Sequence, residues 1–462
     1  MRARFAARTD KAIPLILLTP DRLKGVLSSL PEAQAAWARL HDFCAKSGSR
    51  LVLPGPDGSA DRVLIGLGDT AARARTRFAA GAAIAALPKG VYRAVADDLP
   101  RTLAEEVAFG YLLSCYRFDA YRSQSRVKAG LVPPSNVDSA ALERMAEAEF
   151  LTRDLINTPA EDMGPDELEA AARDLARQFG ANLKKTEGDD LLAANFPLIH
   201  TVGRAAARAP RLLDLGWGTA GPHVTLVGKG VCFDTGGLNL KPGVSMGLMK
   251  KDMGGAAAVL GLAQMIMAAN LPVRLRVLIP AVENAVSGAA FRPGDIPKAR
   301  NGMTVEINST DAEGRLVLAD TLALAAETPP NLLVSMATLT GAARVALGPD
   351  LAPFYTDDDG VAAALSAAGT RVFDPMWRMP FHAPYEAMIE PGIADLNNAP
   401  KGGFAGSITA ALFLRRFTAG VAPYVHLDIY GWQPSAAPGR PKGGAGQGAR
   451  GLFHALPEVL RL

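Results

Sequence analysis

The sequence predicts an α/β protein with two domains: a smaller N-terminal α/β domain, and a larger C-terminal catalytic domain whose mostly parallel central sheet is flanked by helices. Three observations support this prediction. The chain has 462 residues, which is too long for one ordinary hydrophobic core. Short apolar runs alternate with segments of helical periodicity. Several runs in the second part are almost continuously apolar, which is typical of strands buried on both faces of a parallel sheet.

Residues 1–150 are expected to form the N-terminal domain. Its predicted strands are residues 13–18, 50–52 and 63–66, and its predicted helices are residues 101–118 and 141–159. The second helix is expected to end at Pro159 because proline cannot continue a helix. Residues 128–138, with their paired prolines, are predicted to be a linker.

Residues 151–462 are expected to form the catalytic domain. Its predicted strands are residues 222–230, 273–283, 331–339 and 423–432, and its predicted helices are residues 255–268, 315–326 and 408–417. Residues 434–451 are rich in glycine and proline and carry Arg440, Lys442 and Arg450. This segment is predicted to be a solvated, flexible loop.

The bulk composition excludes several classes of protein. The net charge of +3 provides no electrostatic argument for a nucleic-acid partner. No stretch reaches the roughly 18 apolar residues of a membrane helix, and residues 13–18 are too short for the apolar core of a signal peptide. Three sparse cysteines, Cys44, Cys115 and Cys232, do not form a disulfide framework. A cytoplasmic location is therefore predicted.

Two carboxylates, Asp311 and Glu313, stand in the stretch "NSTDAEGRL", directly before an apolar helical run. On a helix they would point about 200° apart, whereas on an extended segment they face the same side. We therefore place them at a strand end or in the turn before a helix, where α/β sheets bind ligands. The alternative is that they only complement the helix dipole.

Two further segments favour a functional role for this pair. "GKGVCFDTGGLNLK" contains Lys229, Asp234 and Lys241, and "LMKKDMGGAA" contains Asp252. Each segment has a carboxylate between an apolar element and a glycine turn, so the four carboxylates are expected to converge on one crevice. Four close carboxylates repel one another, and two divalent cations would offset their charge.

Oxygen ligands suit Mg, Mn or Zn, and none of the six histidines forms an HExxH pair typical of a histidine-based zinc protease. Two such ions can polarise a carbonyl and activate water. Lys241 and Arg315 could stabilise the oxyanion that develops. The residues themselves therefore predict a dinuclear metallohydrolase.

The motifs also resemble those of the leucine aminopeptidase (cytosol aminopeptidase) family of dinuclear-metal exopeptidases. The resemblance rests on "VGKGVCFDTGG", "LMKKDMGGAA", "TDAEGRLVLAD", "MATLTGA" and "HLDIYGW", which occur in family order between about residues 150 and 435. It implies a metalloexopeptidase that releases N-terminal residues, leucine-like ones preferred, from peptides with a free α-amine. Two divalent ions per subunit, Mn or Zn with Mg or Co as further candidates, would activate the attacking water.

The resemblance also implies a role for individual residues. The implied metal ligands are Lys229, Asp234, Asp252, Asp311 and Glu313, with Asp234 and Glu313 bridging the two ions. Lys241 would polarise the scissile carbonyl, and Arg315 would hold a bicarbonate that acts as general base. Met249, Thr338, Leu339 and Gly341 would surround the substrate. One departure from the family pattern is Ser309, which stands where the family usually has asparagine.

The family further implies a homohexamer, in which the N-terminal domain serves oligomerisation or regulation, with no membrane or nucleic-acid partner. Two other functions remain as alternatives. "GVSMG" fits the GxSxG pattern, so an α/β-type serine hydrolase could use Ser245 with Asp428 and His454, although Pro242 argues against a strand before the serine. Some relatives serve as DNA-binding or assembly proteins with secondary peptidase activity.

Three other features are given structural interpretations. "GWGTAG" fits GxGxxG but is followed by a strand, so it is predicted to be a turn between two strands rather than a dinucleotide site. His426 and Asp428 are interpreted as supporting or core residues of a buried strand. Cys232 is interpreted as a small core residue.

Overall fold

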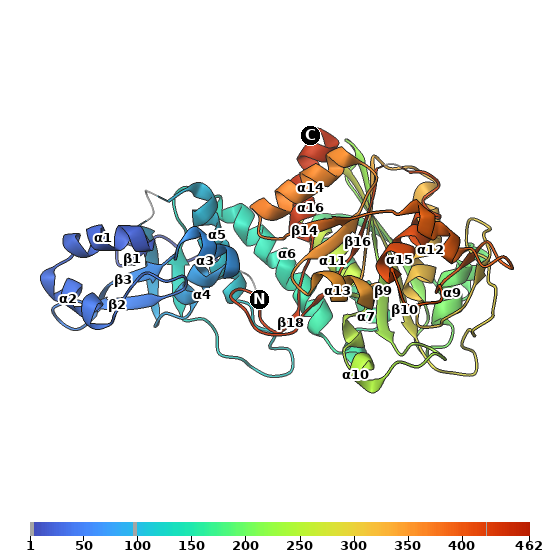
Figure 1. Ribbon diagram of the computed structural model, residues 1–462, viewed down its shortest axis with the longest axis horizontal. Helices are drawn as coiled ribbons and strands as arrows, with labels where there is room; N and C mark the ends of the chain where they lie inside the picture. The colour runs from blue at the N-terminus through green and yellow to red at the C-terminus, as the bar shows by residue number, and fades with distance from the viewer. Residues whose placement is uncertain (1–3, 96–98, 422) are drawn as a thin grey trace. The chain divides into compact units, whose positions relative to one another are not determined.

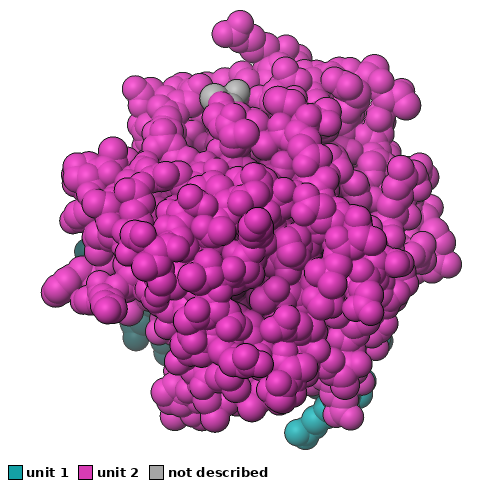
Figure 2. All heavy atoms as spheres, turned by 90° about the vertical axis from the view of Figure 1, so that its right-hand side faces the viewer, with its two compact units in different colours: residues 1–150, 435–442 teal, residues 151–434, 443–462 magenta. Residues whose placement is uncertain are grey.

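The computed structural model describes residues 4–95, 99–421 and 423–462. The chain divides into two compact units, which Figure 2 colours separately. The first unit comprises Met1–Phe150 and Ser435–Lys442, and the second comprises Leu151–Pro434 and Gly443–Leu462. In the described part of the chain, no helix is both long enough and apolar enough to cross a membrane.

The first unit contains a five-stranded sheet in the order β2-β3-β1-β4-β5. Its strands are β1 (Ile13–Leu18), β2 (Arg50–Pro54), β3 (Ala60–Gly66), β4 (Gly90–Val95) and β5 (Ala129–Val132). Its helices are η1 (Pro20–Arg22), α1 (Leu23–Ser29), α2 (Glu32–Leu40), α3 (Thr70–Arg75), α4 (Ala79–Ala85) and α5 (Arg101–Ser114), and α6 (Ser139–Asn157) begins in this unit. Only β2 is antiparallel to its neighbour.

The linker prediction for residues 128–138 is wrong in its first half. Ala129–Val132 form the edge strand β5, which runs parallel to β4 with Ala129 opposite Gly90. The prolines that suggested a linker follow directly after the strand, where no backbone N–H is needed for the sheet. The main boundary between the two units lies within α6, between Phe150 and Leu151.

The second unit is built on a nine-stranded sheet in the order β14-β13-β16-β12-β8-β10-β7-β6, with β9 also paired to β10. Its strands are β6 (Asn182–Glu187), β7 (Arg211–Trp217), β8 (His223–Gly228), β9 (Gly230–Asp234), β10 (Arg274–Asn284), β12 (Leu332–Ala337), β13 (Ala352–Tyr355), β14 (Met376–Met379) and β16 (Tyr424–Asp428). The central strands β16, β12, β8 and β10 are mutually parallel. Antiparallel pairings occur toward both edges. The predicted mostly parallel sheet is confirmed.

Helices cover both faces of this sheet (Figure 1). The helices are η2 (Ala160–Asp162), α7 (Pro165–Phe179), α8 (Asp190–Ala193), α9 (Pro197–Gly203), α10 (Gly243–Met246), η3 (Met249–Lys251), α11 (Gly254–Ala268), α12 (Gly314–Ala326), α13 (Gly341–Leu347), α14 (Asp359–Arg371), η4 (Ala383–Ile389), α15 (Gly406–Arg415) and α16 (Ala449–Leu460). Helices α11, α14 and α16 pack together on one side, and α9, α12 and α15 on the other. The small pairs β11 (Val305–Glu306) with β15 (Leu396–Asn397) and β17 (Trp432–Gln433) with β18 (Gly443–Gly444) complete the unit.

The glycine-rich segment is not a solvated loop along its whole length. Ser435–Lys442 belong to the first unit, whereas Gly443 and Gly444 form β18. Gln447 is buried, and its Oε1 accepts hydrogen bonds from the backbone N–H groups of Tyr430 and Gly431. The prediction of a solvated loop is therefore wrong for this part of the segment. The Gln447 side chain is held inside the unit because it pairs with the backbone N–H groups of a neighbouring turn.

The parallel direction of the central strands brings the predicted site residues to one edge of the sheet. Strands β8, β9, β10, β12 and β16 all end at the same edge of the sheet because they are parallel. Lys229 follows β8, Asp234 ends β9, and Thr338 follows β12. This edge is where open α/β sheets bind their ligands.

Candidate active site

A pocket of about 540 Å³ opens at the carboxyl ends of the central strands. It brings together residues that lie more than one hundred positions apart in the chain. All the predicted site residues line it, namely Lys229, Asp234, Lys241, Met249, Asp252, Asp311, Glu313, Arg315, Thr338, Leu339 and Gly341.

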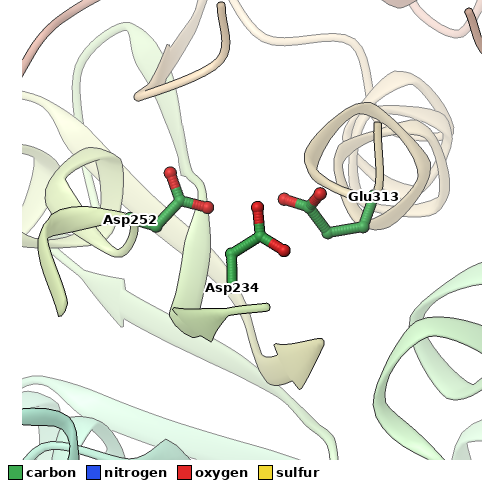
Figure 3. A group of neighbouring side chains, drawn as sticks. All are labelled: Asp234, Asp252 and Glu313. Carbon is green, nitrogen blue, oxygen red and sulfur yellow. The ribbon is translucent and has the colours of Figure 1, made fainter. Parts of the chain in front are cut away.

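Three buried carboxylates form the centre of the pocket (Figure 3). Asp234 ends β9, Asp252 follows the short helix η3, and Glu313 directly precedes α12. One ligand oxygen from each lies within 4.8 Å of the other two. Figure 3 shows the carboxylate of Asp234 between the other two, with all three groups directed toward one another.

Two lysine ammonium groups lie among these carboxylates. Lys229 Nζ donates a hydrogen bond to Asp252 Oδ2 at 2.7 Å and lies 3.0 Å from Glu313 Oε1. Lys241 Nζ lies 2.8 Å from Asp234 Oδ2 and also contacts Asp311. Burial by itself lowers the pKa of both lysines, but the surrounding carboxylates outweigh it and raise the pKa of each. The pocket therefore attracts cations strongly.

Asp311 differs from the other predicted ligands. Its side chain is 37% exposed, and its carboxylate contacts Lys241 rather than the buried group of three. Burial of its carboxylate raises its pKa, which Lys241 partly opposes. The pKa of Asp234 is raised well above its usual value, first by burial and then by the charges of Glu313 and Asp252. Close carboxylates that repel in this way are the donor set that divalent cations fit.

The turn that carries Asp311 is joined to the segment that follows Asp234. Thr310 Oγ1 donates to the carbonyl of Gly236, and the Asn239 N–H donates to Thr310 Oγ1 at 2.8 Å. Gly236 has φ of +87°, and a Cβ there would lie 2.4 Å from the Asn239 oxygen, so no other residue fits this turn. These contacts bring Lys241 back toward the carboxylates.

The hydroxyl of Ser309, at the position where the resemblance suggests an asparagine, stays within its own turn. Its Oγ accepts a hydrogen bond from the Asp311 N–H at 3.2 Å. The amide of Asn398 bridges the same turn, accepting from the Ser309 N–H and donating to the Ser309 carbonyl. An amide side chain from another segment thus supports the turn before Asp311.

Arg315 is buried on the first turn of α12 and lines the pocket. Its Nη1 donates to the carbonyl of Asn398. Its Nε is buried and has no hydrogen-bond partner within the described residues. Burial lowers the pKa of Arg315 to about 10, so the guanidinium remains charged at neutral pH. One N–H of this cation is therefore available to an anion.

Asp428 supports the wall of the pocket rather than its centre. Its Oδ1 accepts from the backbone N–H groups of Leu339 and Thr340, and its Oδ2 accepts from the hydroxyl of Ser407 at 2.8 Å. His426, on the same strand, bonds to Ser335 through Nδ1 at 2.8 Å, and burial lowers its pKa to about 3. Both residues have the supporting roles that their buried strand predicts.

The geometry argues against the serine-hydrolase alternative. Ser245 lies in the helical turn α10, which follows the loop residue Pro242 rather than a strand, so the sharp strand-to-helix elbow of that class is not formed. The carboxylate of Asp428 is occupied by the contacts just described. The "GWGTAG" segment begins with the last two residues of β7 and continues into the connection to β8, which confirms the predicted turn between two strands.

The residues that line the pocket include two cations and a tyrosine to which the sequence reasoning gave no role, namely Lys251, Arg344 and Tyr430. Lys251 is buried, which lowers its pKa to about 8. The doubled lysine of "LMKKDM" was a visible signal, because two cations beside a predicted ligand are unusual in an apolar context. Tyr430 stands in the motif "HLDIYGW", but the sequence reasoning assigned it no role of its own, and Arg344 offered no signal because it reaches the pocket only through the fold.

Two family models together match most of the chain. The model described as the cytosol aminopeptidase family, catalytic domain, matches residues 150–453. The model described as the M17 aminopeptidase, N-terminal domain, matches residues 13–134. The second match covers the part of the chain that carries no recognisable motif of its own.

Curated relatives and solved structures agree with this result. A probable cytosol aminopeptidase of Syntrophotalea carbinolica is 37% identical, covering 98% of this chain and 95% of the relative, and one of Roseiflexus castenholzii is 39% identical, covering 78% of each. The crystal structure of the cytosol aminopeptidase from Coxiella burnetii matches with a TM-score of 0.93 and 43% identity over 98% of this chain and 99% of that one. The bottromycin maturation enzyme BotP in complex with Mn matches with a TM-score of 0.88 and 34% identity over 97% and 99%. The chain therefore belongs to the cytosol aminopeptidase family, a family of metal-dependent exopeptidases.

Proposed function

We propose that this aminopeptidase releases leucine-like N-terminal residues from peptides with a free α-amine, using water activated by two divalent cations. The observation that carries the proposal is the buried group of Asp234, Asp252 and Glu313 at the sheet edge. Mn or Zn, with Mg or Co as further candidates, would be held by these three carboxylates together with Lys229 and Asp311. Bound there, the two ions would supply Lewis-acid polarisation and water activation near neutral pH.

The side chains around the carboxylates have separate roles in this proposal. Asp234 and Glu313 would each help to hold both cations, and Asp234 lies between the other two carboxylates (Figure 3). Lys229 acts as a ligand only as the neutral amine, so it must release a proton when the cations bind. Lys241 donates a hydrogen bond to the scissile carbonyl and stabilises the charge that develops on its oxygen.

Arg315 is proposed to hold a bicarbonate, which would supply a general base near the attacking water. Its unpaired, buried Nε supports this role, because a planar guanidinium binds a planar anion through paired hydrogen bonds. Met249, Thr338, Leu339 and Gly341 surround the N-terminal side chain of the substrate. Asp428 accepts hydrogen bonds from the backbone N–H groups of Leu339 and of the neighbouring Thr340, which keeps this part of the wall in place.

Removal and return of metal tests the proposal directly. Dialysis against a chelator is expected to abolish hydrolysis of a leucyl anilide, and added Mn or Zn should restore it. The same anilide with an acetylated amine should not turn over in any state, because it cannot present a free amine. The control is protein dialysed without chelator. Activity that persists after complete metal removal, as measured by elemental analysis, would contradict the two-cation mechanism.

The two alternative functions predict different behaviour. A serine hydrolase using Ser245 would lose activity to a fluorophosphonate and keep it after chelation. A DNA-binding or assembly protein would be retained on a DNA column in a salt-dependent way. Neither alternative accounts for the four carboxylates around one pocket.

We also propose that the enzyme acts in the cytoplasm as a homohexamer, with residues 1–150 serving oligomerisation or regulation. The support is membership of the family, whose relatives are named cytosol aminopeptidases. Light scattering on the full chain is expected to give six times the chain mass of 48.4 kDa. A stable monomer at micromolar concentration would overturn this part of the proposal without affecting the catalytic one.

A further inference from the structure

Lys251 is a buried cation that faces the active-site pocket. The residue is 7% exposed, lies at the end of η3 and directly precedes Asp252. Lys229 and Lys241 each contact two carboxylates, whereas Lys251 Nζ makes neither a hydrogen bond nor an ion pair within residues 4–95, 99–421 and 423–462. The Lys251 Nζ atom lies over the ring of Tyr430, 5.3 Å from the ring centroid. Burying a charge without a partner costs free energy, and a bound anion that pairs with the charge would reduce this cost.

A second cation contacts the same ring. Arg344 lies on α13, and its guanidinium carbon is 5.2 Å from the Tyr430 centroid. It is exposed, lines the same pocket, and has no ion-pair partner in the part of the chain that the structure describes. The two cations and Tyr430 therefore form one wall of the pocket, which we call the cationic wall.

The charge of the pocket favours an anionic ligand at this wall. Under the proposed function, two divalent cations balance the four carboxylates of Asp234, Asp252, Asp311 and Glu313. The positive charges of the cationic wall then remain uncompensated. A pocket with an excess of one charge raises the local concentration of ligands of the opposite charge and stabilises them on binding.

We propose that Lys251 and Arg344 form a carboxylate-binding subsite, which lets the aminopeptidase act, in addition to leucine-like substrates, on peptides that present a carboxylate next to the scissile bond. This inference rests on the proposed function and names its substrate class. Two sources have this chemistry: the side chain of an N-terminal Asp or Glu, and the terminal carboxylate of a dipeptide. The N-terminal side chain is favoured because Lys251 lies two residues after Met249 on η3, and Arg344 lies one helical turn from Gly341.

Pairs of substrates that have the same shape and differ only in one carboxylate measure the effect of that charge on the rate. The first arm compares the kcat/KM of glutamyl and glutaminyl anilides, and the second compares Leu-Gly with Leu-Gly amide. In the metal-loaded protein we expect the charged member of at least one pair to be favoured by about 10-fold or more, as expected for a hydrogen-bonded charge pair in a partly buried site. The arm that shows the preference identifies the source of the carboxylate.

Variants then assign the preference to the cationic wall. Lys251→Met and Arg344→Gln should each reduce the preference by about 10-fold, the magnitude of a single charge-assisted contact. Arg344 is exposed, so its replacement provides a test that does not depend on tolerance of a buried substitution. Lys250→Met is the matched control, because it removes the same charge at the neighbouring position. Lys250 Nζ donates instead to the Asn157 carbonyl. The control should keep the preference.

Inhibition by free amino acids measures binding to the subsite separately from turnover. L-glutamate should inhibit leucyl anilide hydrolysis at lower concentration than L-glutamine, and Arg344→Gln should remove the difference. Leucyl anilide hydrolysis with no charge preference in either arm, or a preference unchanged in both variants, would overturn the subsite while the proposed function stands. Absence of leucyl anilide hydrolysis in the metal-loaded protein would instead overturn the proposed function.

Discussion

Glu313→Gln is expected to lower hydrolysis of a leucyl anilide by about 10³-fold or more and to remove bound metal, because binding of a catalytic cation supplies several kcal/mol of transition-state stabilisation. The amide keeps the size of the side chain and removes only its charge. Glu313 is buried, lies 3.0 Å from Lys229 Nζ and belongs to the group of three close carboxylates. Elemental analysis of the purified variant and steady-state rates measure the two effects.

Glu327→Gln is the matched control for this prediction. Glu313 precedes α12 and Glu327 follows it, so the two changes lie at opposite ends of one helix. The Glu327 side chain is exposed and makes an ion pair with Arg300. The loss of such a surface ion pair costs less than about 1 kcal/mol of stability. Asp311→Asn is expected to act like Glu313→Gln. Full metal content and full activity in either variant would remove that residue from the proposed ligand set.

Gly255→Ala is expected to lower the free energy of unfolding by about 3 kcal/mol, the upper range for overpacking a rigid site. A Cβ at this position would lie 2.1 Å from the carbonyl oxygen of Met336 and 2.8 Å from the backbone nitrogen of Lys229. Both are backbone atoms, so neither can move without displacing a strand. Chemical denaturation monitored by circular dichroism measures the change.

This substitution should also reduce activity. The Lys229 N–H donates to the Met336 carbonyl at 3.0 Å, and the Lys229 carbonyl accepts from the Ala256 N–H at 2.8 Å. Moving α11 away from β12 therefore displaces a proposed metal ligand. Gly243→Ala, in a helical turn where a Cβ would meet no atom within 4 Å, is the control and should leave stability unchanged. An unaltered denaturation midpoint in Gly255→Ala would show that the backbone of Met336 and Lys229 can move to make room for the added methyl group.

The central strands and the donor set could be predicted from the sequence. The near-continuous apolar runs around residues 223–228 and 332–337 are confirmed as β8 and β12, because a strand buried on both faces needs apolar residues at every position. The carboxylates were recognisable because each stands between such a run and a glycine turn. The edge strand β5 was not, because four residues before two prolines have too little pattern to distinguish a strand from a linker.

The sequence by itself determined which chemical groups the predicted site offers: the four carboxylates, Lys229, Lys241 and Arg315, beside predicted strand ends. Only the tertiary structure decided which of them meet. It places Asp311 against Lys241, apart from the three buried carboxylates, and it brings Arg344 and Lys251 to the two contacts with Tyr430. The physical reason is that local pattern fixes where a strand or helix begins and ends. Contacts between distant residues depend instead on strand order and register, which the packing of the whole unit selects.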